Sequence, residues 1–335
     1  MEASASKKMM QMVIGFAGIY FFFLLQGQMN EAVVKKGKFK QSWMLVAVEA
    51  FASTIFGAIF MVFFKLGGIY SIKDQIKFYG PSGMAQVFAK YLTNASMVYG
   101  VSFPVATCAK SAKMVPALIG SIFSLGLKEG SKKVAKPRPW VQTSLVVGGT
   151  IILNLAEKSK GGEDSTFGVL LLLLALTCDG GVSFCQEKLR HVMKQNKWDN
   201  NFEFQFLTNL YMFLTACIFM VLSGEVQPGL AFLQANPEVL MNLVYLSLAS
   251  ACGQGVIFYV VANLGPSFNA CVTTSRKVFS VLLSVYLSGK VLNTQGYTGV
   301  GLVAIGVAGE VQEKLQAATA EIKKADNAEK GKKTK

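Results

Sequence analysis

The chain has 335 residues, of which 52% are hydrophobic and only 16% are charged, too few charges to cover the surface of a soluble protein of this length. The formal net charge of +14 would suit a nucleic-acid-binding protein, but the lysines and arginines lie between apolar runs, which excludes that class. We therefore predict an all-α membrane protein whose main surroundings are the lipid bilayer.

Apolar runs long enough to cross a membrane recur along almost the whole chain, since one span needs about 20 apolar residues. Three of them, the third, fourth and eighth, are diluted by Gly, Ser, Asn or Lys, as expected of helices that line a cavity. We predict about ten transmembrane helices, over residues 9–28, 42–64, 83–101, 106–127, 140–156, 166–186, 204–223, 238–261, 268–289 and 295–312.

The basic residues predict the orientation of these spans. An even number of spans puts both termini on one side, and with the termini in the cytosol most of the 33 lysines and arginines fall in cytosolic segments. This bias follows the positive-inside rule. The loop that contains Lys35, Lys36, Lys38 and Lys40 departs from it, because it falls on the luminal side.

The sequence contains an internal repeat. Residues Cys108–Leu127 align without a gap on Cys271–Lys290, and the alignment sets the cation of Lys113 over that of Arg276. Each copy holds five spans, and because five is odd the second copy must insert upside down. We predict two inverted five-helix repeats and a disordered basic tail, over residues 1–160, 161–312 and 313–335.

Charged residues stand inside several predicted spans, where each costs roughly 2.5–3.5 kcal/mol at a helix centre. Lys110 and Lys113 share one helix face, while Arg276 and Lys277 enter from the opposite side of the membrane. Two cationic pairs that approach the midplane suit a di- or triphosphate. The alternative is snorkelling of long side chains to the headgroups, which explains Lys90 at a helix end but not the deeply placed Lys277.

Other side chains complete this candidate site. Thr273 could add a hydroxyl donor, and Tyr99 could hold a base or a sugar, although such groups often serve helix packing. Glu49 and Asp179 could neutralise the lysines when no substrate is bound, could couple protons, or could form ion pairs between helices. We rank neutralisation first.

Little in the sequence favours an enzyme. The six cysteines lie in apolar segments without metal-ligand spacing, so we expect no metal and no cofactor. The single histidine, His191, lies in a basic loop, and no phosphate-binding loop follows a strand. A membrane enzyme that uses Asp179 alone is the alternative to a carrier.

Three stretches, Val101–Pro116, Cys178–Leu189 and Val272–Ser284, resemble the nucleotide-sugar transporter family of the drug/metabolite transporter superfamily, in particular subfamily B of solute carrier family 35. The Lys-x-x-Lys pair before a proline and the Thr-Thr-x-Arg-Lys run carry most of this resemblance. It implies ten helices in two inverted repeats. It also implies antiport of cytosolic UDP-galactose or UDP-glucose for a luminal nucleotide. The implied phosphate contacts are Lys110, Lys113, Arg276 and Lys277.

The resemblance leaves alternatives. The endoplasmic reticulum branch of the subfamily includes a proposed ATP/ADP exchanger, which is the second candidate function. A sister branch carries phosphoadenosine phosphosulfate and has Gln where this chain has Lys277, which disfavours that substrate. Phe103 stands where the family usually has Tyr. The sequence leaves open whether the carrier forms a homodimer.

The tail predicts the cellular address. Lys332 and Lys333 have the spacing of a di-lysine signal, which coat proteins read to return membrane proteins to the endoplasmic reticulum. We expect the protein in the endoplasmic reticulum membrane, with the Golgi membrane as the alternative.

Changing both Lys332 and Lys333 to Ser should let a tagged copy reach the Golgi, as seen by colocalisation with markers. An unchanged location would show that the tail is only a solvated charge run.

Overall fold

The computed structural model describes residues 2–63, 72–101, 105–106, 109–110, 137–158, 166–195, 201–264, 272–273, 276, 279, 293–309, 312 and 316. Over these residues the chain is almost entirely helical and contains no β-strand. Residues 294–309 form one helix. The other described helices are α1 (Glu2–Glu31), the π-helix η1 (Ala32–Lys36), α2 (Ser42–Phe63), α3 (Ile72–Val98), α6 (Pro137–Lys158), α7 (Thr166–Gln195), α8 (Asn201–Leu222), α9 (Val226–Ala235) and α10 (Pro237–Leu264).

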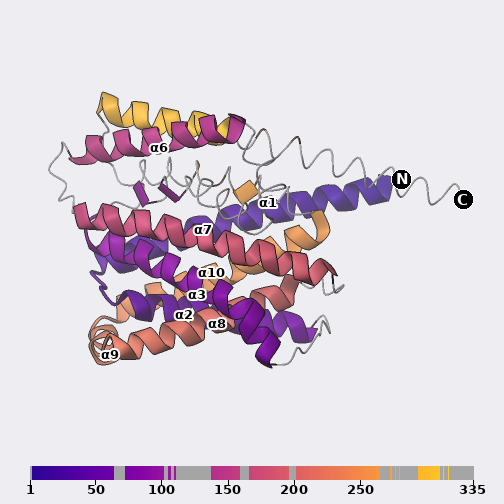
Figure 1. The fold of residues 1–335 in the computed structure, drawn as a ribbon, viewed down its shortest axis with the longest axis horizontal. Coiled ribbons are helices and arrows are strands. Elements are labelled where there is room, and N and C mark those ends of the chain that lie inside the picture. Colours follow the sequence, from indigo (N-terminus) through magenta and orange to yellow (C-terminus); the bar gives the residue numbers. More distant parts are fainter. Residues whose placement is uncertain are drawn as a thin grey trace, which may run out of the picture.

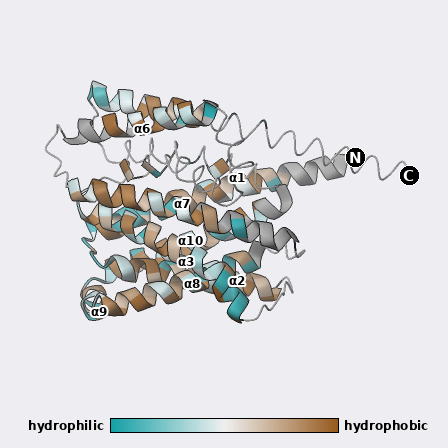
Figure 2. Cartoon of the chain, in the orientation of Figure 1, coloured by the Kyte–Doolittle hydropathy of each residue, from teal (hydrophilic) through white to brown (hydrophobic). Residues whose placement is uncertain are grey.

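The outer faces of the helices are apolar, as a bilayer requires. In α2, Ile59, Val62 and Phe63 are 56%, 79% and 80% exposed, and large apolar side chains of α1, α8 and α10 are exposed in the same way. Figure 2 shows hydrophobic residues along the length of these helices. Within the described residues, four helices are long and apolar enough to span a membrane: Met10–Lys36, Ser42–Phe63, Glu203–Leu222 and Pro237–Ile257.

Several helices run beyond the predicted spans. Helix α3 begins at Ile72 instead of residue 83 and contains Pro81, and α7 continues to Gln195. The sequence did not predict α9, a short helix between α8 and α10. Hydropathy marks only the apolar part of a helix, whereas backbone hydrogen bonds continue it through polar residues into water. The predicted spans 106–127 and 268–289 lie largely outside the described residues.

The helices pack as a bundle with three main seams (Figure 1). Helix α2 packs against α8, α3 against α7, and α1 against α10; α10 also meets α2, and α3 also meets α8. Glycines allow the closest approaches. A Cβ on Gly57 of α2 would lie 3.0 Å from the Cα of Phe206 of α8, and one on Gly83 of α3 would lie 2.8 Å from the Cβ of Tyr211.

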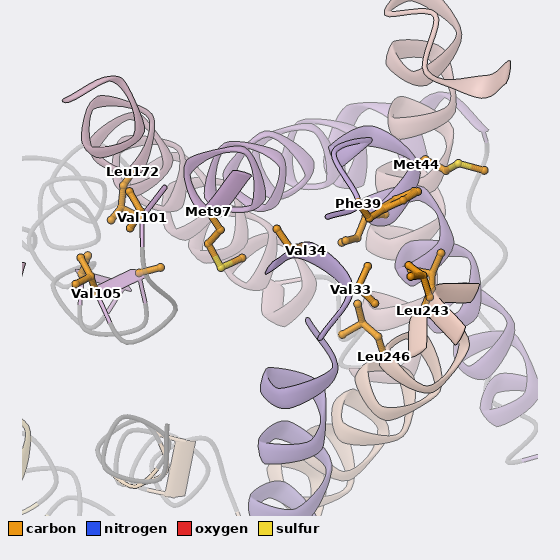
Figure 3. Packing of buried hydrophobic residues seen from close by; sticks show 14 of the residues in the cluster. Val33, Val34, Phe39, Met44, Met97, Val101, Val105, Leu172, Leu243 and Leu246 are labelled. Atoms are coloured by element: carbon orange, nitrogen blue, oxygen red, sulfur yellow. The ribbon is translucent and has the colours of Figure 1, made fainter. Parts of the chain in front are cut away.

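An apolar cluster, which we call the end plug, joins η1 and α10 to the neighbouring helices. It includes Val33 and Val34 of η1, Phe39, and Leu243 and Leu246 of α10. In Figure 3 Val33 lies toward the two leucines, whereas Val34 points to the far side of η1, toward Met97. The neighbouring Lys36, Lys38 and Lys40 are exposed. The loop that broke the charge rule therefore buries its valines and keeps these lysines outside.

The glycine seams generate a stability prediction. Gly83→Ala should lower the stability of the protein by about 1–3 kcal/mol, because the new methyl group meets the backbone of α8 and the side chain of Tyr211. Gly148→Ala in α6 is the matched control, since its Cβ would meet nothing within 4 Å. Thermal unfolding of the purified protein in detergent measures both. Equal effects would show that the seam tolerates extra volume.

Candidate functional site

Arg276 is the best-described cation of the predicted site. It lies in helical backbone, its side chain is half-buried, and its Cζ stands 4.5 Å from the centroid of the Phe23 ring of α1. Its Nε is buried and has no hydrogen-bond partner among the residues that the structure describes. A guanidinium that keeps an unused donor in apolar surroundings can bind an anion.

The surroundings of Arg276 are apolar and aromatic. Val272, one turn before it, packs with Ile19 of α1 and Val260 of α10 in a small buried cluster. The rings of Tyr20 and Phe279 meet with centroids 5.7 Å apart. Such a setting excludes much of the water that would otherwise weaken a bond between the guanidinium and a phosphate.

The other predicted cations are described in part. Lys110 is half-buried, and the adjacent Ala109 belongs to the end plug. Lys113 and Lys277 lie outside the described residues. Thr273 is half-buried and precedes Arg276 by three residues, a spacing that puts both on the same side of a helix.

Tyr99 lies immediately after α3, and its side chain is 50% exposed. Its ring meets Phe167, at the start of α7, edge to face with centroids 4.9 Å apart. This contact belongs to the α3–α7 seam. The proposed role of Tyr99 in holding a base or sugar stays a prediction.

Glu49 and Lys90 form an ion pair between α2 and α3. Lys90 Nζ lies 2.9 Å from Glu49 Oε2, with the two side chains 20% and 5% exposed. The interpretation of Lys90 as a snorkelling residue at a helix end is therefore wrong. Helix α3 starts earlier than predicted, which puts Lys90 well inside it, and a nearby carboxylate satisfies its charge. Asp179 is half-buried within α7, and its balancing role stays a prediction.

Sequence reasoning missed Glu225, which links the turn between α8 and α9 to the start of α2. Its carboxylate, between α8 and α9, accepts hydrogen bonds from the backbone N–H groups of Trp43 (2.9 Å) and Met44 (3.2 Å) at the start of α2. Burial raises the pKa of Glu225, while these two bonds act in the opposite direction. A carboxylate at a helix N-terminus satisfies backbone N–H donors that have no partner within the helix. Glu225 is far from α2 in the sequence, so no sequence pattern indicates this contact.

A buried polar stripe follows one face of α8. Gln205, Thr208 and Asn209 are each at most 3% exposed, and Asn209 Nδ2 donates to Gln254 Oε1 of α10 at 3.0 Å. The side chains of Gln205 and Thr208 find no hydrogen-bond partner within the described part of the chain. This stripe can offer amide and hydroxyl groups to a polar ligand. Within the same residues, no group of three or more His, Cys, Asp or Glu could hold a metal ion.

Comparison with known proteins identifies similar chains. The family model described as "UAA transporter family" matches residues 11–314. Solute carrier family 35 member B1 of Danio rerio is 29% identical, over 87% of this chain and 88% of that protein. The Xenopus tropicalis protein of the same name is 27% identical, over 89% and 92%.

The chain is also similar to a transporter with a different name and to one solved structure. The Aedes aegypti protein named adenosine 3'-phospho 5'-phosphosulfate transporter 2 is 28% identical, over 86% of this chain and 72% of that protein. One crystal structure superimposes with a TM-score of 0.54 at 14% identity, over 92% of this chain and 98% of the other. At that identity the superposition shows a shared fold alone.

The ion pair predicts a non-additive pair of substitutions. Lys90→Met should destabilise the protein by about 3–5 kcal/mol, because it leaves the Glu49 carboxylate buried without its cation. Glu49→Gln combined with Lys90→Met should recover most of that loss. Thermal unfolding of single and double variants gives the coupling, with Lys36→Met, an exposed lysine of η1, as the control. If Lys90→Met behaves like Lys36→Met, the pair contributes nothing.

Proposed function

The chain belongs to the UAA transporter family, a membrane family of nucleotide-sugar and nucleotide transporters, and from this premise we propose which solute it carries and how. We propose an antiporter that exchanges cytosolic UDP-galactose or UDP-glucose for a luminal nucleotide by alternating access. Its relatives are solute carriers, so the expectation of a transporter instead of an enzyme is confirmed. The sequence resemblance to subfamily B of solute carrier family 35 is confirmed as well.

The observation that carries the proposal is the free donor of Arg276. The Phe23 ring covers the guanidinium at 4.5 Å, and the buried Nε has no partner among the described residues. A phosphate can satisfy this donor with a charge-assisted hydrogen bond. Lys113 and Lys277 would supply further charge to the same phosphates, with Lys110 and Thr273 assisting. Asp179 would balance the lysines between transport events, whereas Glu49 is already paired with Lys90 and would not be available to them.

The packing of the helices supports two inverted repeats, residues 1–160 and 161–312, within a ten-helix fold. Under that repeat the first, second and third spans correspond to the sixth, seventh and eighth. The repeat then relates the contact between α1 and α10 to the contact between α7 and α3. It relates the contact between α2 and α10 to the contact between α8 and α3 in the same way. The α2–α8 contact maps onto itself. A pairing pattern of this kind is expected of two halves related by a pseudo-two-fold axis.

The polar stripe of α8 supports a second part of the site, for the base or the sugar. Gln254 is half-buried and bonded to Asn209, which leaves the buried Gln205 and Thr208 side chains, without partners among the described residues, as the groups that would bond a ligand. A substrate of this kind would reach Arg276 with its phosphates and the α8–α10 pair with its base. Tyr99 would contribute its ring.

One comparison supports an adenosine nucleotide as substrate, which is the class of the second candidate, an ATP/ADP exchanger, and of the sulfate donor. The mosquito relative is named for an adenosine nucleotide, and it is about as similar to this chain as the others are. An adenosine diphosphate or triphosphate offers the same anionic groups to Arg276. We place the carrier in the endoplasmic reticulum membrane, because Lys332 and Lys333 form a di-lysine pair.

The test is counterflow in proteoliposomes with labelled UDP-galactose, UDP-glucose, ATP, ADP and the sulfate donor. Arg276→Ala should weaken the apparent affinity for the transported nucleotide by about tenfold to a hundredfold, the loss expected for one charge-assisted hydrogen bond. Arg276→Lys should also be impaired, because it keeps the charge but loses the planar fork. Lys113→Ala and Lys277→Ala should behave similarly.

Two outcomes would contradict the proposal. One is wild-type affinity in Arg276→Ala, Lys113→Ala and Lys277→Ala alike. The other is a preference of the wild-type protein for free sugars or other uncharged solutes over nucleotides. Lys36→Ala, on the exposed side of η1, is the matched control for removing a cation away from the site.

A further inference from the structure

We propose that Phe23 of α1 is a positioning residue, which holds the Arg276 guanidinium so that its Nε edge faces the substrate phosphate. The inference rests on the proposed function, because it concerns how the phosphate site is built. It adds a residue that carries no charge and that belongs to a different helix.

The Phe23 ring lies on one face of the Arg276 guanidinium and leaves the N–H donors in the guanidinium plane for a ligand. Its Cζ lies 4.5 Å from the centroid of the Phe23 ring, well within the range of about 6 Å for a cation–π contact. A ring at that distance occupies one side of the group, while the N–H donors point outward in the guanidinium plane. The buried Nε has no partner among the described residues, so its N–H is the donor that we assign to a phosphate oxygen.

Phe23 is itself held by the α1–α10 seam. A Cβ on Gly253 of α10 would lie 2.9 Å from Phe23 Cε2, so the glycine lets the ring lie directly against the backbone of α10. One turn along each helix, Gln26 Nε2 donates to Ser250 Oγ at 3.1 Å. A Cβ on Gly18 would lie 3.0 Å from Val256 Cγ1. The ring therefore lies tightly against α10 at Gly253, in a seam that one hydrogen bond and a second close glycine contact hold together on either side of it.

This arrangement has a mechanical consequence. Arg276 rests on a ring that the α1–α10 seam fixes, so a shift of α1 against α10 would move the guanidinium as well. Alternating access requires the two halves of a carrier to move relative to each other. Under the predicted repeat, α1 and α10 belong to different halves. Phe23 thus couples the position of the phosphate ligand to the contact between those halves.

The test compares Phe23→Leu with Phe21→Leu in full-length protein reconstituted in proteoliposomes. Both changes replace a phenylalanine of α1 by an apolar side chain, but Phe21 is 63% exposed on the outer face. Phe23→Leu should raise the KM for the transported nucleotide by about twofold to thirtyfold, as expected for loss of a cation–π contact, with little change in kcat. Phe21→Leu should match wild type, and Phe23→Tyr, which keeps the ring, should restore the affinity.

A second variant protects the test against misfolding. Gly253→Ala keeps Phe23 but pushes its ring away from α10, so it should also raise KM, and adding Phe23→Leu to it should cause no further loss. Inhibition of transport by UDP is compared with inhibition by uridine, which lacks the phosphates. A change in packing alone would affect both inhibitors equally. The Phe23→Leu change should weaken UDP and leave uridine unaffected, with ADP and adenosine as the pair for an adenosine carrier.

The outcomes separate this inference from the proposed function. If Arg276→Ala loses affinity while Phe23→Leu and Gly253→Ala do not, the positioning role is wrong and the phosphate role of Arg276 stands. If Phe23→Leu weakens the nucleoside as much as the nucleotide, the ring contacts the base and does not position Arg276. If Arg276→Ala has wild-type affinity, Arg276 does not bind the phosphate, and the positioning role of Phe23 fails together with that assignment.

Discussion

A charge inside a lipid bilayer needs a partner, and this constraint explains the charged residues of the bundle. Glu49 and Lys90 satisfy each other at 2.9 Å, so their joint contribution to the surrounding potential is small. Arg276 differs, because an aromatic ring covers it and a buried donor stays unused among the described residues. A protein whose stability alone mattered would have little reason to keep such a group. A carrier of anionic nucleotides has one, since the substrate completes the pair.

The packing of the helices holds these charged side chains in place. It must also permit the movement of the helices that the proposed alternating access requires. Glycine seams bring α2, α3 and α10 into close contact with their neighbours. The end plug, which joins η1, Phe39 and α10 to neighbouring helices, consists of apolar side chains. Contacts of this kind can separate and re-form as a unit. The proposed alternating access would require that separation at the predicted luminal end.

Sequence reasoning was strongest where one physical signal dominates. The span predicted at 42–64 coincides with α2, Ser42–Phe63, because apolar length decides it. It was weakest where a partner lies elsewhere in the chain. Lys90 resembled a helix-end lysine until α3 proved to begin at Ile72, and Glu225 gave no sign of its bonds to α2. Phe23 is one of three consecutive phenylalanines, and nothing in the sequence indicates that its ring lies between Gly253 and Arg276. Lys113 and Lys277 remain sequence predictions.

The central claim is that Arg276 exists to bind substrate phosphate. The most direct measurement is the binding of UDP and of uridine to the purified wild-type protein and to Arg276→Ala by calorimetry, with ADP and adenosine as the second pair. The account predicts that wild type binds the diphosphate more tightly than the nucleoside, and that Arg276→Ala loses most of this preference through weaker diphosphate binding alone. Equal discrimination by the two proteins would contradict it.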